Sequence, residues 1–152
     1  MRDDLYFHFE DISEFSLPDH ICDWIKGVIL NEEFVLSEVN VVFTSDHYLL
    51  TLNKKHLAHD YYTDIVTFDY RTEPKEIRGD LFISKERVTE NATTFNVSIN
   101  HELLRVVVHG LLHLFGYSDK SEKDKELMRS MEDFYLSLYT NKYVSRGTYR
   151  VY

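Results

Sequence analysis

Two histidines in the C-terminal half of the chain have the spacing of metal ligands. His109 and His113 lie four residues apart, so on one helix their imidazoles leave the same face, separated by about 6 Å along the axis. Gly116 can adopt a positive φ and end that helix, which lets the chain turn back and bring Asp119 beside both rings. Three protein ligands and a position open to water are typical of catalytic zinc, which supports metal-assisted hydrolysis at neutral pH.

The sequence around the two histidines predicts a buried helix, because residues 103–115 are apolar almost all round. Buried imidazoles need partners, and a buried polar group without one costs about 1–3 kcal/mol. Two core histidines bonded to backbone carbonyls are the alternative interpretation. Asp119 is also a capping candidate, with Ser118 and Ser121, for a helix over residues 122–139.

The periodicity of the remaining chain predicts helices and strands that interleave. Alternating or β-branched segments predict four strands, and segments with helical spacing or a capping serine predict five helices. The final helix has Leu127, Met131, Phe134 and Leu138 at the spacing of a core-facing stripe. The predicted strands cover residues 5–10, 38–44, 64–70 and 79–84, and the predicted helices cover residues 21–29, 45–53, 84–94, 103–115 and 122–139.

These elements predict an α/β (α+β) fold with a small mixed four-stranded sheet, about five helices and the metal site on a buried helix. The 152 residues are expected to form one domain. The chain contains no apolar run long enough for a membrane span, and its N-terminus lacks the layout of a signal peptide. The single cysteine, Cys22, excludes an intramolecular disulfide and is predicted to be a small core residue. We therefore expect a cytoplasmic protein.

The net charge of −9 argues against a nucleic-acid partner, since proteins that bind phosphates are usually basic. A cleft that is locally positive would remove this objection, and several cations lie between the acidic segments. Residues 141–152 form a basic, aromatic C-terminal tail that is either an RNA-stacking segment or simply a docked or disordered terminus. The cations between the acidic segments are Lys54, Lys55, Arg71, Lys75, Arg78 and Lys85.

The string H-G-x-L-H-L-x-G-Y, which begins at His109, resembles the signature of the YbeY family of bacterial rRNA maturation factors, which are zinc-dependent single-strand endoribonucleases. In that family the string normally ends in Asp-His, and the final His is the third ligand. The resemblance therefore places Asp119 on the third-ligand position. Upstream segments at 52–53, 62–68 and 79–84 also resemble the family, so the likeness covers most of residues 46–135.

The resemblance implies an endoribonuclease with one zinc ion per chain that acts in ribosome biogenesis, at the 3′ end of 16S rRNA. Its implied partners are single-stranded rRNA, the small ribosomal subunit and a ribosomal protein or GTPase, without a membrane. The family usually carries an arginine where this chain has Leu57, and Lys54, Lys55 and His59 could supply the missing charge in the cleft.

Arg105 lies one turn before His109 and is expected either to face the cleft and hold a phosphate or to form an ordinary salt bridge. The general base is not identified by the sequence. His59, Asp64 and Asp80 are candidates by the resemblance of their segments, and both aspartates have a structural interpretation at strand ends.

Three other functions share parts of this pattern. Metzincin proteases have similar ligand spacing, but they need a glutamate directly after the first histidine as general base, and this chain has Gly110 there. A non-haem iron oxygenase uses two histidines and one carboxylate, but usually draws them from separated strands. A metal-bearing assembly factor without catalytic activity is the third alternative.

Overall fold

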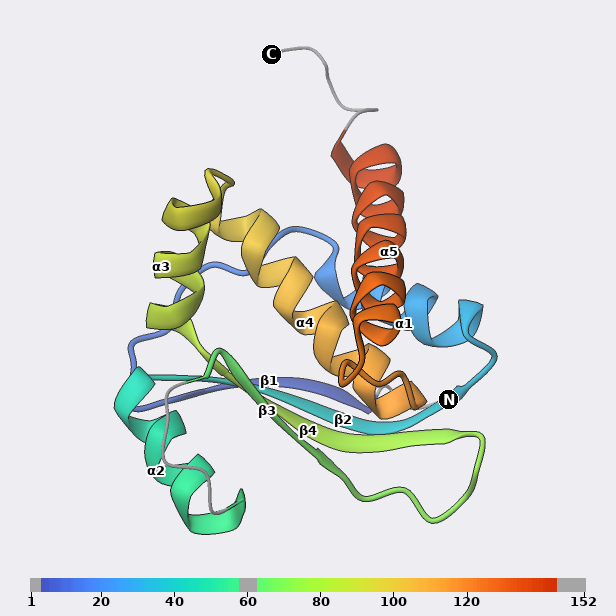
Figure 1. The fold of residues 1–152 in the computed structure, drawn as a ribbon, viewed down its shortest axis with the longest axis horizontal. Coiled ribbons are helices and arrows are strands. Elements are labelled where there is room, and N and C mark those ends of the chain that lie inside the picture. The colour runs from blue at the N-terminus through green and yellow to red at the C-terminus, as the bar shows by residue number, and fades with distance from the viewer. Residues whose placement is uncertain (1–3, 58–62, 145–152) are drawn as a thin grey trace.

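Four strands form one mixed sheet and five helices pack around it, in a computed structural model that describes residues 4–57 and 63–144 (Figure 1). This confirms the predicted fold class. The strands are β1 (Leu5–Glu10), β2 (Val35–Thr44), β3 (Ile65–Asp69) and β4 (Glu76–Ser84). The helices are α1 (Ile21–Asn31), α2 (Asp46–Leu57), α3 (Lys85–Phe95), α4 (Ile99–Phe115) and α5 (Glu122–Tyr139), followed by a short π-helical turn, η1 (Thr140–Val144).

The strand order is β1-β2-β4-β3, in which β1, β2 and β4 are parallel and β3 is antiparallel to β4. Figure 1 shows α1, α3, α4 and α5 on one face of the sheet and α2 on the other. The antiparallel strand β3 forms one edge of the sheet, and α4 packs against both β3 and β4.

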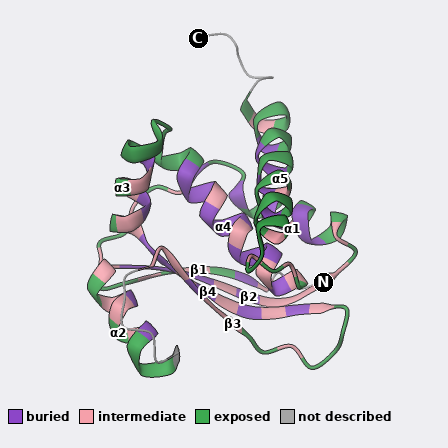
Figure 2. Cartoon of the chain, in the orientation of Figure 1, coloured by how far each residue is buried: buried purple, intermediate pink, exposed green. Residues whose placement is uncertain are grey.

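The core lies between the sheet and the layer of four helices. Every second residue of the central strands points toward the helices, because successive side chains of a strand alternate between faces. The inward residues of β2 and β4 are almost fully buried, and α4 is buried along most of its length (Figure 2). These inward residues are Val39, Val41 and Phe43 on β2 and Ile77, Leu81 and Ile83 on β4. No described helix combines the length and the hydropathy needed to cross a bilayer.

Two glycines allow α4 to lie unusually close to the sheet. A β-carbon at Gly110 of α4 would lie 2.6 Å from the side chain of Ile65 and 2.9 Å from that of Leu81. A β-carbon at Gly79 of β4 would meet the backbone carbonyl of the neighbouring strand and lie 3.2 Å from the methyl groups of Leu114. The absence of both side chains therefore sets the distance between α4 and the β3–β4 pair.

Two predictions at the level of single elements were wrong. Cys22 is exposed rather than part of the core. The stripe predicted to pack against the core from α5 lies largely outside it, with Leu127 51% exposed, Phe134 44% and Leu138 41%. Several elements extend three or four residues beyond their predicted bounds, namely α2, α4, β2 and β4. Ser45 caps α2 as predicted, by accepting a hydrogen bond from the backbone N–H of Tyr48 at 3.0 Å.

Candidate metal centre

The helix that carries both histidines is fixed at its two ends by its own sequence. The side chain of Ser98 accepts a hydrogen bond from the backbone N–H of His101 and caps the first turn. Gly116 ends the helix at φ 110°, a conformation that favours glycine, and its N–H donates to the carbonyl of His113 at 3.0 Å. The predicted stop at Gly116 is thus present in the structure.

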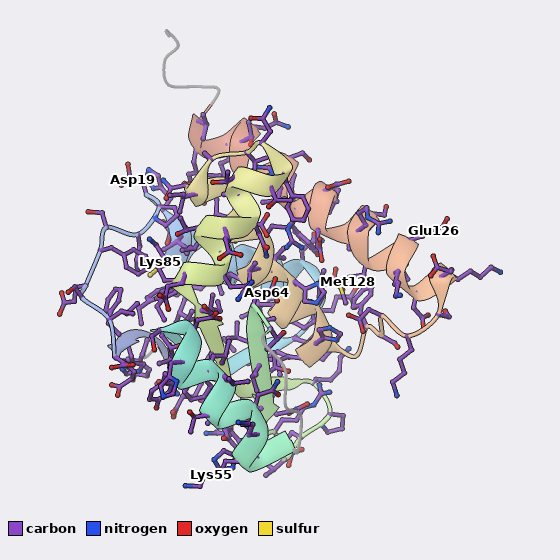
Figure 3. The ribbon with its side chains drawn as sticks, turned by 60° about the vertical axis from the view of Figure 1, so that its left-hand side comes forward. Asp19, Lys55, Asp64, Lys85, Glu126 and Met128 are labelled. Atoms are coloured by element: carbon purple, nitrogen blue, oxygen red, sulfur yellow. The ribbon has the colours of Figure 1, made fainter. Side chains whose placement is uncertain are left out.

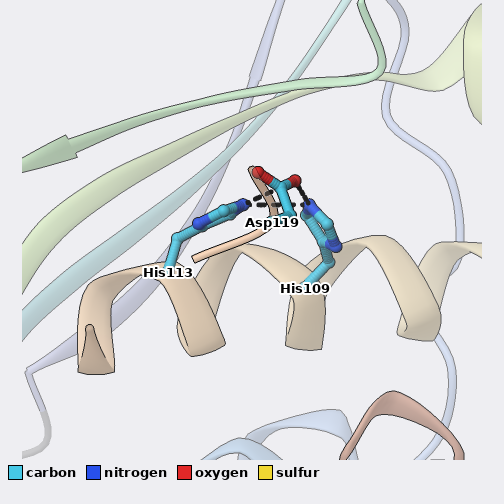
Figure 4. A group of neighbouring side chains, drawn as sticks. All are labelled: His109, His113 and Asp119. Atoms are coloured by element: carbon cyan, nitrogen blue, oxygen red, sulfur yellow. Dashed lines mark hydrogen bonds and ion pairs between the residues drawn. The ribbon is translucent and has the colours of Figure 1, made fainter. Parts of the chain in front are cut away.

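The turn after Gly116 brings Asp119 to the two histidines, as shown in Figure 4. The Nε2 atoms of His109 and His113 lie 3.1 Å apart. The Oδ2 atom of Asp119 lies 3.6 Å from the first of these nitrogens and 3.3 Å from the second. The three side chains form the one group found among the described residues that could hold a metal ion through three or more His, Cys, Asp or Glu ligands.

The outer nitrogens of both rings are engaged, which determines where their protons lie. Nδ1 of His113 lies 3.0 Å from the backbone carbonyl of Tyr117, and a carbonyl only accepts, so this nitrogen carries the proton. Nδ1 of His109 lies 2.6 Å from Oε2 of Glu132, and this carboxylate oxygen is the acceptor for an Nδ1–H. When both rings are neutral, their Nε2 atoms therefore present unprotonated lone pairs toward one another and toward the Asp119 carboxylate.

This donor set fits a tetrahedral cation. Zinc bound at about 2.0–2.2 Å by nitrogen and oxygen ligands holds neighbouring donors about 3.3 Å apart, and the three separations here are 3.1, 3.3 and 3.6 Å. Two lone pairs and a carboxylate oxygen at these distances repel one another unless a cation or a proton lies between them. The side chains of His109, His113 and Asp119 are 21%, 28% and 43% exposed, so the group opens to solvent on the Asp119 side.

Asp119 is not used to cap the following helix. The Ser121 hydroxyl caps α5 by accepting a hydrogen bond from the backbone N–H of Asp124 at 3.0 Å. The Asp124 carboxylate in turn accepts a hydrogen bond from the backbone N–H of Ser121. The capping role that competed for Asp119 in the sequence is therefore filled by Ser121. Ser118 accepts from the backbone N–H of Lys120 and lies outside the group of donors.

A buried network of charges lies directly behind His109. Arg105 makes two hydrogen bonds to the carboxylate of Glu102, at 3.0 and 2.5 Å, and a third at 3.2 Å to Oε1 of Glu132. A further ion pair at 3.7 Å joins Arg105 to Asp64, which precedes β3. Glu102 and Glu132 are only 1% and 4% exposed, so Arg105 holds two buried carboxylates and, through Glu132, orients His109.

The network contains more negative than positive charge. Glu102, Glu132 and Asp64 share Arg105 as their cation in the described contacts, and Asp119 adds a fourth carboxylate at the histidines. Burial raises the pKa of Asp64 even though Arg105 and His109 act to lower it. Burial also acts to lower the pKa of Arg105, but its hydrogen bonds to and attraction by Glu102 outweigh this and raise it. A divalent cation at the histidines would offset the excess of negative charge.

The other residues predicted for the cleft are not gathered at this site. Lys54 and Lys55 lie in the last turn of α2, on the opposite face of the sheet, and His59 lies outside the described residues. Figure 3 shows Lys55 and Lys85 far apart, with Asp64 away from both, near the centre of the view. Arg71 and Lys75 lie over the ring of Phe34, and Arg78 pairs with Glu38 and Glu76. Asp80 accepts from Asn40 on the outer face of the sheet.

Part of the predicted C-terminal tail contacts the body of the protein. The ring of Tyr143 stacks on His20 with centroids 4.6 Å apart and lies 5.3 Å from the ring of Tyr139. The residues after Val144 are outside the described part of the chain.

Sequence reasoning missed Glu132, Tyr117 and Glu32, although each contributes to the centre or its supports. Glu132 had a detectable signal, because it lies one turn from Met128 and Leu136 on the buried side of α5. Glu32 accepts a hydrogen bond from the hydroxyl of Tyr117 at 3.0 Å, and this bond together with burial raises the pKa of Tyr117 to about 12. Glu32 follows a different helix and gave no such signal.

The close contact at Gly110 bears on the protease alternative. This position faces Ile65 and Leu81 of the sheet, where a β-carbon alone would overlap both side chains. A glutamate would not fit between α4 and the sheet as they stand. The carboxylate that a metzincin requires after its first histidine is thus absent from the sequence and has no room in the structure.

Comparison with known proteins shows the family to which the chain belongs. The family model described as "Endoribonuclease YbeY" matches residues 8–140. A protein named Endoribonuclease YbeY from Flavobacterium johnsoniae is 48% identical over 135 residues, covering 88% of this chain and 95% of the relative. A protein of the same name from Cytophaga hutchinsonii is 44% identical over 140 residues, covering 91% of this chain and 98% of the relative. The chain therefore belongs to the YbeY family.

A solved structure supports the same assignment. The solution structure of a Thermotoga maritima protein superposes with a TM-score of 0.65 at 27% sequence identity and covers 93% of each chain.

Proposed function

We propose that this chain is a zinc-dependent endoribonuclease that cleaves single-stranded ribosomal RNA during rRNA maturation in the cytoplasm. The observation that carries the proposal is the convergence of two Nε2 atoms and a carboxylate oxygen, at 3.1–3.6 Å from one another, on the face of α4. Membership of a family whose members are named endoribonucleases supplies the reaction class. The 3′ end of 16S rRNA is the proposed region of cleavage.

In this proposal His109, His113 and Asp119 hold one zinc ion. When bound there, zinc lowers the pKa of a coordinated water to about 7 and stabilises negative charge on a phosphoryl oxygen. Glu132 accepts from Nδ1 of His109, and the Tyr117 carbonyl accepts from Nδ1 of His113, so each neutral ring directs its Nε2 lone pair toward the metal.

Arg105 acts through Glu132 rather than as a phosphate ligand. Its guanidinium is shared among Glu102, Glu132 and Asp64, so little of its hydrogen-bonding capacity is left for RNA. It holds the Glu132 carboxylate in place against His109. A ribosomal protein or GTPase is proposed to deliver the enzyme to the small subunit.

The first experiment measures metal content by mass spectrometry on protein purified without chelators or affinity metals. We expect about one zinc per native chain and a large loss in Asp119→Ala. Asp133→Ala, which removes an exposed carboxylate of α5, is the matched control and should retain the metal. Native protein without metal after incubation with zinc would refute the proposed centre.

The second experiment tests the reaction. A single-stranded RNA carrying the 3′ region of 16S rRNA is incubated with native enzyme, with His113→Ala, and with native enzyme plus a chelator. Cleavage should be lost in His113→Ala and in the native enzyme with chelator. It should return when zinc is added back to the chelated native enzyme. Full cleavage under chelation would refute metal dependence, and a zinc-loaded protein that leaves RNA intact would favour the assembly-factor alternative.

A further inference from the structure

One carboxylate outside the proposed ligand set joins three separate elements of the fold. Glu32, directly after α1, accepts a hydrogen bond from the hydroxyl of Tyr117 through Oε1 at 3.0 Å. Its other oxygen accepts a short hydrogen bond from the hydroxyl of Tyr135 on α5. The Tyr135 hydroxyl in turn accepts from the side-chain amide of Asn31 at 2.9 Å. Glu32 thus ties the end of α1 both to α5 and to the turn that follows α4.

Tyr117 is the residue through which this carboxylate reaches the metal centre. Its backbone N–H donates to the carbonyl of Leu112 at 3.0 Å, and its own carbonyl accepts from Nδ1 of His113 at 3.0 Å. Its hydroxyl is held by Glu32. The residue is therefore fixed by backbone and side chain at once, between Gly116, which ends α4, and Asp119, the third candidate ligand.

We propose that Glu32 is a positioning residue of the metal centre and acts through the Tyr117 hydroxyl. By holding the Tyr117 side chain against α1, it keeps the Tyr117 carbonyl at His113 and limits the movement of the turn that carries Asp119. The inference rests on the proposed metal centre. It adds to that centre a residue 85 positions upstream of Tyr117 in the sequence, outside the motif that contains the candidate ligands.

The need for such a support follows from the exposure of the turn. Asp119 is the most exposed of the three candidate ligands, at 43%, and the residues around it belong to no helix or strand. Freedom of a ligand in the metal-free state weakens binding, because that freedom must be lost when the metal binds. The hydrogen bond from Tyr117 to Glu32, two residues before Asp119, restricts this freedom before the metal binds. Partners behind metal ligands typically change metal affinity by about 10–100-fold when they are removed.

The two tyrosines provide a matched pair of variants. Tyr117→Phe and Tyr135→Phe each remove one hydroxyl from the same carboxylate, but only the first lies on the turn that carries Asp119. The zinc dissociation constant is measured by competition with a chromophoric chelator, and the free energy of unfolding of each metal-free protein is measured in urea. We expect about tenfold weaker zinc binding in Tyr117→Phe with little change in metal-free stability. Tyr135→Phe should mainly lower stability, because Tyr135 is fully buried.

A double-mutant cycle tests whether Glu32 acts through Tyr117. Glu32→Ala should weaken zinc binding in the native background and add little in the Tyr117→Phe background. The Nδ1–H signal of His113 in the NMR spectrum of the zinc-bound protein should shift in Tyr117→Phe and stay in place in Tyr135→Phe. A Glu32→Ala effect of the same size in both backgrounds would overturn the inference, as would native zinc affinity in Tyr117→Phe.

The outcomes separate this inference from the proposed function. If the native protein takes up no zinc, the metal centre itself fails and the positioning role fails with it. If the native protein binds zinc and cleaves RNA but Tyr117→Phe binds zinc equally well, only the positioning role is refuted. Tyr117→Phe removes a single oxygen atom from a partly exposed side chain, so it decides the question even if Glu32→Ala does not fold.

Discussion

Replacing Glu132 by glutamine tests whether the charge behind His109 contributes to metal binding. Both groups that contact this carboxylate are donors, since Nδ1–H of His109 lies 2.6 Å from Oε2 and the guanidinium of Arg105 lies 3.2 Å from Oε1. A glutamine has one oxygen and one NH₂ group, so whichever partner receives the oxygen, the other faces a donor. Glu132→Gln therefore keeps the size of the side chain and removes one of the two interactions.

The magnitude follows from the burial of the site. Glu132 is 4% exposed, so water cannot replace the lost partner, and a buried donor left without an acceptor costs about 1–3 kcal/mol. If glutamine disfavours the His109 orientation needed for binding, zinc affinity falls by about 10–100-fold, or about 1.4–2.7 kcal/mol. The metal-free protein is less affected, because removing one carboxylate also reduces the excess negative charge around Arg105.

The assay compares unfolding with and without zinc. Stabilisation by a bound ligand depends on its concentration relative to Kd, so zinc at a fixed saturating concentration should stabilise Glu132→Gln about 1.4–2.7 kcal/mol less than native protein. For a chain of this size that loss lowers the zinc-induced increase in Tm by about 3–10 °C. The neighbouring exposed residue provides the control, Asp133→Asn, which should behave as native protein. Equal zinc stabilisation in Glu132→Gln and native protein would refute the role assigned to Glu132.

Two further predictions test the surroundings of the centre. Burial makes the pKa of Asp64 higher in the folded state than in the unfolded state. The contribution of this carboxyl to the free energy of unfolding is therefore complete below its unfolded pKa of about 3.8, and it is lost as pH rises through the higher folded pKa. Asp64→Asn should accordingly make metal-free protein more stable to urea at pH 7, with a gain that shrinks toward pH 4; a constant difference across this range would contradict the assignment. Gly79→Ala should lower the free energy of unfolding by about 1–3 kcal/mol, because the new methyl group would meet a backbone carbonyl and Leu114. Gly27→Ala on α1, where a β-carbon meets nothing within 4 Å, should leave stability unchanged or raise it slightly, and equal losses in both would count against the packing argument.

The sequence was sufficient to predict the fold class and the group of candidate ligands, because both depend on local patterns. Period-two and helical spacing, together with serine caps at Ser84 and Ser121, locate elements within a few residues of their observed bounds. The distance between His109 and His113 is fixed by helix geometry, and Gly116 required only a positive φ to turn the chain back. Each of these features involves residues that are close in sequence.

The supports of the centre were not predictable in this way, because they depend on how distant elements pack. Glu132 reaches His109 from a different helix, and Glu32 reaches Tyr117 from 85 residues upstream. The spacing of Glu32 does not distinguish it from an exposed surface charge, and the spacing of Glu132 indicates a buried side of α5 but not its partner. Only the crossing of α1, α4 and α5 over the sheet brings these carboxylates beside the histidine helix.

The wrong prediction for α5 shows how the polar partners determine the orientation of a helix. This helix carries two stripes at helical spacing, and the more apolar one, with Leu127, Phe134 and Leu138, is the one left exposed (Figure 2). The buried side instead contains Glu132 and Tyr135, whose polar atoms contact His109 and Glu32. A prediction from apolar spacing considers only the transfer free energy of each helix face. A face with polar groups can nevertheless be the buried one when its polar atoms have hydrogen-bond partners. The buried side of α5 is therefore the side whose carboxylate and hydroxyl have partners at the centre.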